Sequence, residues 1–366
     1  MRILHINCNY IGTTLHQLMI EELDSIGIEN EVFVPTYDKN IAVINVNSNV
    51  QVVECFKKWH RVFFDYKQHK IIKAIEKKYD VSSFDLIHAY TLYTDGNVAR
   101  ILSEKYNIPF VVAVRNTDVN TFFKKMKLLR HRGIETMKKA KYVFFLSEAY
   151  KKAVFDKFIP DKFKEELQSK THVIPNGIDD FWFANENRES KEKKLFDEIR
   201  LVYAGVIDKN KNIETTQSAI RILQNHGLNV KLTVVGKKKD TAVFNTIIQD
   251  PNTTVLSPMP KEKLIDIYRS ADIFIMPSYT ESFGLVYVEA MSQGLPIIYS
   301  KGQGFDEQFQ NGMVGYSVYA NSPQSVADGI RNVLHEYSDI QSRVVNSARR
   351  FNWKEIVKYY YSLYCS

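Results

Sequence analysis

The sequence predicts an α/β protein with two Rossmann-like domains, each built on a doubly wound parallel sheet. Three observations lead to this class. Short apolar runs without polar alternation, such as residues 272–278, recur between amphipathic segments, as in parallel strands that helices cover on both faces. The series of strands and helices starts again after a charged segment at residues 185–194. The chain has 366 residues, 45% of them hydrophobic, which is enough for two domains of ordinary size.

The first domain is expected over residues 1–178, where short apolar runs alternate with segments of helical periodicity. Its strands are expected near residues 2–8, 30–36, 84–90, 109–115 and 142–147. Its helices are expected near residues 13–26, 55–79, 96–106 and 120–142. The turn dipeptide Asn176-Gly177 lies close to its end. Residues 179–198, which contain the charged segment, are expected to form a linker.

The second domain is expected over residues 199–352 and repeats the same pattern. Its strands are expected near residues 199–207, 230–236, 253–258, 272–278 and 294–300. Its helices are expected near residues 213–226, 261–270 and 284–293. The last helix, at about 353–366, has enough apolar and aromatic positions that we expect it to pack back on the first domain. Two such domains predict a ligand-binding cleft between them.

The net charge of +7 is concentrated in one region. Residues 51–150 contain 19 Lys and Arg against 10 Asp and Glu, whereas the remainder contains 30 against 32. The expected helices at about 55–79 and 120–142 mix lysines with Phe, Trp, Leu or Met, which is typical of helices lying on anionic lipid. Alternatively, they pack their apolar faces on a sheet and leave the lysines in water. We expect no nucleic-acid partner, because no binding motif is present.

The beginning of the chain reads as a strand and has no small-residue cleavage site, so we expect no signal peptide. No stretch approaches the roughly 18 apolar residues of a membrane span. The scattered cysteines, Cys8, Cys55 and Cys365, form neither a disulfide framework nor a metal-ligand spacing. We therefore expect a cytoplasmic protein that is soluble or peripheral on the cytoplasmic membrane face.

The segment from Gly284 to Gln293 predicts a functional helix that contains a glutamate, Glu289. Apolar side chains point in almost every direction around this helix, which is typical of a buried helix. Its polar residues share one stripe that includes Ser282, Glu289 and Ser292. The stripe either faces water or faces a ligand. The flanking apolar strands favour a βαβ unit, and its helix then starts where open α/β sheets bind ligands.

At the start of this helix, free N–H groups and the helix dipole favour an anion, and Gly284 allows close approach. Glu281 precedes the site and Glu289 follows eight residues later, roughly 12 Å away if the helix is continuous. Two carboxylates acting on one glycosidic bond lie about 5 to 10 Å apart. We therefore expect these two to hold opposite ends of a long ligand with an anionic middle, such as a nucleotide sugar.

The pattern Glu281-Ser-Phe-Gly-x4-Glu289-Ala-Met-x2-Gly-x-Pro resembles the E-x7-E signature of glycosyltransferase family 4, retaining sugar-nucleotide transferases of GT-B fold. The stretches "VIPNGID", "YRSADIFIMPS" and "FNW" match in the same order, so the resemblance spans nearly the whole chain. It implies that Glu289 binds the ribose hydroxyls. It also implies that Glu281 and the helix start hold the donor sugar and diphosphate, through the residues Ser282, Phe283, Gly284 and Leu285.

The resemblance extends to three loops, with departures. Gly12 matches the second glycine of a Gly-Gly turn near the phosphates, but Ile11 replaces the first. In the stretch "AGVIDKNKNI", Gly205 and the lysine match the family, with Lys211 or Lys209 in the lysine's place. Val206 stands there where the family has an arginine. In "RNTD", Asp118 is kept and Arg115 replaces a histidine. Arginine contacts phosphate but accepts no proton at neutral pH.

The resemblance implies a retaining transfer of a sugar from a nucleoside-diphosphate sugar, a UDP- or GDP-sugar, to an acceptor hydroxyl. We expect this transfer to be metal-independent and to serve cell-surface polysaccharide synthesis, and the local excess of basic residues favours a glycan or lipid-linked acceptor. Its expected catalytic residues are Glu281, Lys211, Arg115 and Asp118. No Asp-x-Asp motif for a divalent cation is present, and no cofactor is expected. The departures leave open a non-catalytic subunit that binds sugar nucleotide or scaffolds another transferase. A sugar-nucleotide epimerase on the same fold is a third possibility.

Overall fold

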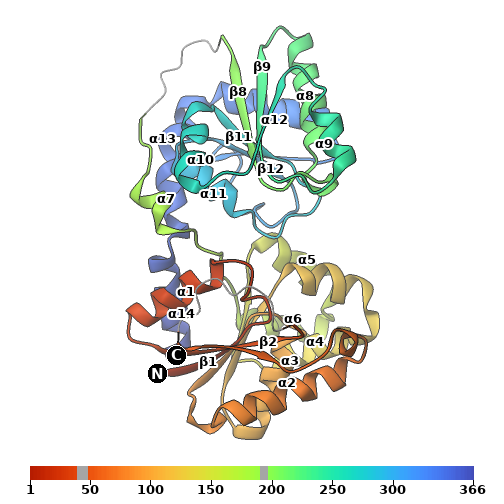
Figure 1. Cartoon of the computed structure of the whole chain (residues 1–366), viewed down its shortest axis with the longest axis vertical. Helices are drawn as coiled ribbons and strands as arrows, with labels where there is room; N and C mark the ends of the chain where they lie inside the picture. The colour runs from red at the N-terminus through yellow and green to blue at the C-terminus, as the bar shows by residue number, and fades with distance from the viewer. Residues whose placement is uncertain (39–47, 190–196) are drawn as a thin grey trace. The chain divides into compact units, whose positions relative to one another are not determined.

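The chain forms two compact units (Figure 1). The structure, a computed structural model, describes residues 1–38, 48–189 and 197–366. The first unit comprises Met1–Leu146, Tyr150–Gly177 and Trp353–Ser366. The second comprises Ser147–Ala149 and Ile178–Asn352. Within the described ranges, no helix combines the length and the hydropathy that a membrane crossing requires.

The first unit contains a seven-stranded parallel sheet. Its strands are β1 (Arg2–Ile6), β2 (Glu29–Thr36), β3 (Val50–Glu54), β4 (Leu86–Ala89), β5 (Phe110–Val114), β6 (Tyr142–Phe145) and β7 (Thr171–Val173). The strand order is β3-β2-β1-β4-β5-β6-β7, so the direction of winding reverses at β1 and β4. In this register Ile3 pairs with Asn30 on one side and Leu86 on the other. The expected doubly wound sheet is therefore confirmed, with β3 and β7 as additional edge strands.

Helices cover both faces of this sheet (Figure 1). The α-helices of the first unit are α1 (Leu15–Ser25), α2 (Phe64–Lys78), α3 (Asp95–Tyr106), α4 (Arg130–Lys139), α5 (Glu148–Phe158), α6 (Asp161–Ser169) and α14 (Trp353–Cys365). Short helical segments are η1 (Lys58–Val62), η2 (Val81–Ser83), η3 (Asp118–Phe123) and η4 (Lys127–Leu129). One apolar core lies between the sheet and α2, α3 and α4, and a second lies between the sheet and α1 and α14. Strand side chains alternate between the two cores.

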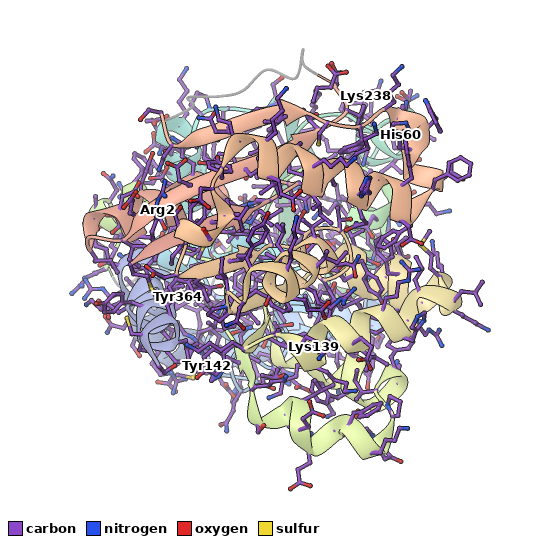
Figure 2. The ribbon with its side chains drawn as sticks, turned by 90° about the horizontal axis from the view of Figure 1, so that it is seen from below. Arg2, His60, Lys139, Tyr142, Lys238 and Tyr364 are labelled. Atoms are coloured by element: carbon purple, nitrogen blue, oxygen red, sulfur yellow. The ribbon has the colours of Figure 1, made fainter. Side chains whose placement is uncertain are left out.

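The last helix, α14, packs on the first unit's sheet. The hydroxyl of Tyr364 is hydrogen-bonded to Nδ1 of His88 on β4 at 2.8 Å. The hydroxyl of Tyr142 on β6 lies 2.8 Å from Oγ of Ser366. Figure 2 shows Tyr142 and Tyr364 on this side of the first unit. At the other end of α14, a Cβ added to Gly177 would lie 2.6 Å from the Trp353 ring, so glycine is needed there.

The prediction of two long continuous basic helices, at residues 55–79 and 120–142, is wrong. The first is split into the 3-10 segment η1 and the helix α2. The second is split into the π-helical segment η3, the 3-10 turn η4 and the helix α4. Both α-helices bury their apolar faces in the core of the first unit, so their apolar stripes are not available to lipid. The alternative expectation, lysines in water on core-packed helices, holds for α2 and α4.

The second unit contains a six-stranded parallel sheet with the order β10-β9-β8-β11-β12-β13, which again reverses in the middle. Its strands are β8 (Ile199–Ala204), β9 (Val230–Val235), β10 (Thr253–Leu256), β11 (Ile273–Met276), β12 (Ile297–Ser300) and β13 (Gly315–Val318). Its helices are α7 (Asp180–Ala184), η5 (Lys209–Lys211), α8 (Ile213–Asn225), α9 (Thr241–Ile247), α10 (Lys261–Ser270), α11 (Leu285–Ser292), α12 (Pro323–His335), α13 (Tyr337–Ala348) and η6 (Arg349–Phe351). The second expected Rossmann-like domain is therefore confirmed.

The expected linker at 179–198 differs from the structure. Asp179 accepts a hydrogen bond from the N–H of Phe181 at 2.8 Å and caps α7, which packs against α11 of the second unit. Residues 190–196, which include the end of the charged segment, lie outside the described residues. The first residues of the expected linker therefore form a helix of the second unit, because Asp179 caps α7 there.

Candidate active site

An ion pair joins the ends of two neighbouring strands in the second unit. Nζ of Lys211, at the end of η5 after β8, lies 2.5 Å from Oε2 of Glu281, which follows β11. Because β8 and β11 are adjacent parallel strands, their carboxyl ends open at the same edge of the sheet. Both side chains are largely shielded, with 20% and 11% of their surface exposed. Two residues that the sequence selected independently are thus brought together.

Two asparagines that the sequence analysis missed hold these loops in register. Asn210 donates from Nδ2 to the carbonyl of Thr280 at 2.8 Å, and the N–H of Thr280 donates back to Asn210 Oδ1 at 3.0 Å. Asn212 donates to the carbonyl of Pro277 at 2.9 Å and has a left-handed φ of 59°. Asparagine tolerates this conformation and readily forms hydrogen bonds with backbone groups. The repeated Lys-Asn pattern at residues 209–212 was therefore the sequence feature that could have indicated these two residues.

The turn that carries Glu281 is fixed by close backbone contacts. Oε1 of Glu281 accepts from the N–H of Ser282 at 3.0 Å, and the Glu281 N–H donates to Gln303 Oε1 at 3.1 Å. The N–H of Gly304 donates to the Glu281 carbonyl at 2.9 Å. A Cβ on Gly304 would lie 1.8 Å from the Ser282 carbonyl oxygen, so no larger residue fits. Gly304 carries no specific sequence signal, yet it positions the turn.

The helix α11 begins one residue later than expected, after Gly284. Gly284 has a φ of 81°, and a Cβ there would lie 2.4 Å from the ring of Tyr287. Phe283 is buried against Phe305, with ring centroids 5.8 Å apart, so its side chain belongs to the core. The N–H groups of Leu285 and Val286 precede the first intrahelical bond, because the Tyr287 N–H already donates to the Gly284 carbonyl at 3.0 Å. This end of α11 therefore offers backbone donors and the positive end of a dipole to an anion.

Because α11 starts at Leu285 and Glu281 precedes it, as expected, the spacing of roughly 12 Å that a continuous helix would give the two glutamates does not apply. Glu289 lies on α11 and is half-buried. Burial raises the pKa of Glu289 to about 7; repulsion from Asp179 adds to the rise, and attraction to Lys261 opposes it. Lys261, the first residue of α10, forms an ion pair with Asp179. Glu289 therefore stands in a polar cluster of the second unit rather than on an open surface.

The neighbours of Glu289 in the polar stripe also turn away from water. Ser292 and Gln293 are 0% and 2% exposed. The hydroxyl of Ser292 donates to the carbonyl of Glu289 at 2.6 Å, and Gln293 accepts from the side chain of Arg269 at 3.1 Å. The alternative that this stripe faces water is therefore wrong for these residues. Glu289 alone among the three keeps partial access to solvent.

The remaining expected donor residues of the second unit lie in the loop after β8. The carbonyl oxygen of Gly205 leaves no room for a side chain at Gly236, whose added Cβ would lie 1.7 Å from it. Val206 is 36% exposed, and its carbonyl accepts from the Tyr203 hydroxyl at 2.6 Å. Lys209 is exposed on η5. The loop after β8 thus packs closely on the backbone at Gly236. At position 206 it exposes an apolar side chain, where the family has an arginine.

In the first unit, Asp118 is a structural ligand of backbone N–H groups. Its buried carboxylate accepts from Leu92 at 3.0 Å, from Tyr93 at 3.2 Å and from Arg115 at 2.9 Å. Burial raises the pKa of Asp118 to about 6, although these three hydrogen bonds oppose the rise. The carboxylate joins the loops that follow β4 and β5, so we assign it a positioning role.

Arg115 and Gly12, the other expected residues of the first unit, are also placed at strand ends. Arg115 donates from Nε to the carbonyl of Tyr90 at 3.3 Å and from Nη1 to Asn176 Oδ1 at 3.0 Å. Burial lowers its pKa. Gly12 has a φ of 94° in the turn after β1, and an added Cβ would meet nothing within 4 Å. Glycine is favoured at position 12 by this left-handed backbone conformation, and the space beside its Cα is open.

Two family models match the chain and together span most of it. The model for Glycosyltransferase Family 4 matches residues 13–180, and the model for Glycosyl transferases group 1 matches residues 185–351. The chain is 25% identical over 303 residues to an uncharacterized glycosyltransferase of Methanocaldococcus jannaschii, covering 76% of this chain and 74% of that protein. It is 28% identical over 171 residues to a capsular polysaccharide biosynthesis glycosyltransferase of Staphylococcus aureus, covering 44% of each. The chain thus spans from under half to about three quarters of these relatives.

Solved structures share the fold over the whole chain. Sucrose-phosphate synthase from Thermosynechococcus elongatus superposes with a TM-score of 0.76 at 19% identity, covering 100% of this chain and 98% of that one. The Anabaena protein HepE in complex with UDP superposes with a TM-score of 0.72 at 17% identity, covering 99% of both. At these identities the likeness concerns the fold alone. With both family models matched and this fold, the chain belongs to the family 4 glycosyltransferases of the GT-B class.

Proposed function

We propose that this chain transfers a sugar from a nucleoside-diphosphate donor to an acceptor hydroxyl, with retention at the anomeric carbon and without a metal ion. The observation that carries the proposal is the pairing of Lys211 with Glu281 before the amino terminus of α11. This arrangement supplies a cation, a carboxylate and helix N–H donors at one edge of the second unit's sheet. Such a set suits a diphosphate joined to a sugar.

In the proposed reaction, the bond between the anomeric carbon and the diphosphate oxygen breaks, and a bond to the acceptor oxygen forms. The acceptor proton passes to the departing diphosphate, so no protein base is required. Lys211 then exchanges part of its contact with Glu281 for the phosphate oxygens. The helix N–H groups stabilise the same developing charge, and Glu281 accepts hydrogen bonds from sugar hydroxyls.

Glu289 is proposed to bind the ribose of the donor. A carboxylate accepts two hydrogen bonds from a diol, and Glu289 combines partial access with a polar neighbourhood. The complex of HepE with UDP supports a uridine nucleotide as the first donor to test, and a GDP-sugar is the second. The capsular polysaccharide relative supports a glycan or lipid-linked glycan as acceptor.

The test is transfer from labelled UDP- and GDP-sugars to lipid and glycan acceptors extracted from membranes. We expect a product whose anomeric configuration matches the donor, and equal rates with and without EDTA. Glu281→Gln should remove transfer, whereas Lys209→Ala, in the same turn, should keep it. Loss of activity with EDTA would contradict the metal-free route.

A non-catalytic subunit is the second candidate, because an apolar side chain occupies position 206 beside the expected diphosphate site. Nucleotide binding without transfer to any acceptor would favour this candidate. Conversion of one sugar nucleotide into another would instead favour an epimerase.

A further inference from the structure

Exposed apolar side chains gather in two segments of the first unit. The most exposed large apolar side chains among the described residues are Leu128 at 89% and Val62 at 82%. Four more belong to the same two segments: Trp59, Phe63, Tyr66 and Met126. Six of the sixteen exposed large apolar side chains in the described residues thus fall within residues 59–66 and 126–128. Single exposed apolar residues are ordinary, but such a concentration marks a binding surface.

The fold joins the two segments directly. Asp65 at the start of α2 forms an ion pair with Arg132 at the start of α4. The rings of Phe64 and Phe122 lie 6.4 Å apart, and the guanidinium of Arg132 lies 5.6 Å from the Phe64 ring. Every exposed apolar residue of the two segments is within six positions of one of these contacts. Residues from separate parts of the sequence therefore meet at one place on the first unit.

Lysines flank the exposed apolar groups in the sequence. They are Lys57, Lys58, Lys70, Lys124, Lys125 and Lys127. The sequence has no acidic residue between Asp118 and Glu135, and Asp65 is the single acid between residues 55 and 74. Because Asp65 is paired with Arg132, little negative charge offsets these lysines. We name residues 57–70 and 124–128 together the lysine–aromatic surface.

The aromatic members of this surface form a group of their own. The Trp59 ring lies 6.0 Å from that of Phe63 and is stacked 6.5 Å from that of Tyr66. His60 fills the space beneath, 4.0 Å from Trp59 and 4.8 Å from Tyr66, and Figure 2 shows it at the edge of the molecule in that view. Trp and Tyr beside lysines are typical of groups at a membrane interface.

We propose that the lysine–aromatic surface docks this protein on an anionic lipid bilayer. Trp59, Phe63 and Leu128 enter the boundary between headgroups and acyl chains, while the lysines contact the lipid phosphates. This proposal corrects the expectation based on whole helices, because α2 and α4 use their apolar faces for the core. Trp59, Phe63 and Leu128 lie instead in the short segments that precede the two helices, and Tyr66 and Lys70 lie in the first two turns of α2.

The surface connects to the expected acceptor side of the first unit. The π-helical segment η3 begins at Asp118, which binds the loop after β4, and leads to Phe122. Phe122 stacks on Tyr93 of that loop at 4.4 Å. π-helical turns often occur at functional sites. Docking at this surface would bring the loop of Arg115 and Asp118 near a lipid-linked acceptor. Vesicle binding itself requires no sugar transfer.

Tryptophan fluorescence gives a direct test, because the chain has 3 tryptophans. Trp182 and Trp353 are each 3% exposed, whereas Trp59 is 57% exposed. With vesicles of phosphatidylcholine and phosphatidylglycerol, we expect a blue shift of the emission and quenching by brominated acyl chains. Trp59→Phe should remove the shift and retain flotation. An unchanged emission on bound vesicles would overturn insertion at this surface.

Flotation with vesicles tests the two contributions separately. Phe63→Ser with Leu128→Ser should weaken binding at least about tenfold, since each side chain loses apolar burial. Lys124→Glu with Lys127→Glu should weaken binding to anionic vesicles at low salt and reduce the salt dependence of the binding that remains. The matched control is Tyr319→Ser in the second unit, because Tyr319 is 57% exposed, like Trp59. Circular dichroism of each variant verifies folding.

Three results would overturn the proposal. The first is no flotation of the unaltered protein with anionic vesicles at low salt. The second is equal flotation of the surface variants and the control. The third is a surface substitution that abolishes self-association of the chain, seen by analytical ultracentrifugation, without altering vesicle binding. That result would assign the surface to a second copy.

Discussion

The ammonium of Lys211 lies 2.5 Å from the carboxylate of Glu281, across a sequence separation of 70 residues. The pair depends on two adjacent strands, β8 and β11. It also depends on Asn210, whose side chain donates to the carbonyl of Thr280 and accepts from its N–H. A buried ion pair contributes little net stability by itself. Its position before a helix amino terminus instead gives it a role in binding an anion.

Replacing the lysine tests this role. Lys211→Met should lower kcat/KM by about 100- to 1000-fold, as for loss of one donor to a developing charge. Lys209→Met removes an exposed lysine from the same turn and should change kcat/KM less than about fivefold. The measurement is initial rates with the donor identified by the transfer assay. Equal losses in both variants would mean that general positive charge, rather than this pair, assists the reaction.

Substitutions at two glycines of one loop, Gly302 and Gly304, test the effect of backbone strain separately from the effect of a displaced turn. Gly304→Ala places a Cβ 1.8 Å from the Ser282 carbonyl oxygen, so the turn before α11 must shift. We expect donor affinity to fall at least about tenfold, because the helix N–H groups are displaced. Gly302→Ala meets no atom within 4 Å but has a φ of 72°, so it should cost about 1 kcal/mol of stability and keep affinity. Calorimetry of UDP binding and thermal unfolding distinguish the two.

Asp118 predicts a stability effect in the first unit. The carboxamide of Asp118→Asn has one acceptor oxygen for three N–H donors, so an NH₂ group faces an N–H. We expect the free energy of unfolding to fall by about 1–3 kcal/mol in urea denaturation at neutral pH. Asp156→Asn on the exposed side of α5 is the control, with no measurable change. An equal effect of both substitutions would remove the assigned positioning role.

The alternation of apolar strands with helices predicted both sheets, because each strand buried on two faces has a recognisable composition. The local signal of Gly284 and Glu289 likewise predicted the start of α11 to within one residue. The sequence could not predict the contact of Lys211 with Glu281, since it depends on which strands are neighbours. Gly304 was missed because its need arises from the approach of a distant backbone.

The lysine-rich segments show a different limit. Their periodicity is helical, but Phe63 and Leu128 are exposed beside helices whose other apolar residues are buried. Hydrophobicity alone does not distinguish a core residue from a docking residue, since both are apolar. Only the packed structure separates the two groups.

Glu289 predicts a pH dependence of stability and of nucleotide binding. Burial raises its pKa from 4.5 to about 7 in the folded protein, so folding disfavours the charged form. Between about pH 4.5 and 7 the unfolded chain binds fewer protons at this group than the folded protein, and stability therefore falls as pH rises. Above this window the ionised carboxylate costs at most on the order of 3 kcal/mol. Below it the cost disappears.

Glu289→Gln removes this cost while keeping the shape of the side chain. We expect the variant to be more stable than the unaltered protein above pH 7 and equally stable near pH 4.5, in urea denaturation at several pH values. Asp95 and Asp118, whose pKa values burial raises to about 7 and about 6, contribute the same trend in both proteins. The difference between the two curves therefore isolates Glu289. A constant difference across the range would show that Glu289 does not titrate in this window.

Nucleotide binding should lower the pKa of Glu289, whereas burial raises it. Ribose hydroxyls that donate to the Glu289 carboxylate favour its charged form and lower its pKa. At pH 7 about half of the free protein carries the proton, so binding should release up to about half a proton per nucleotide. Calorimetry of UDP in buffers of different ionisation enthalpy measures this release, and Glu289→Gln should abolish it. Release that persists in the variant would place the titrating group elsewhere and remove Glu289 from the ribose site.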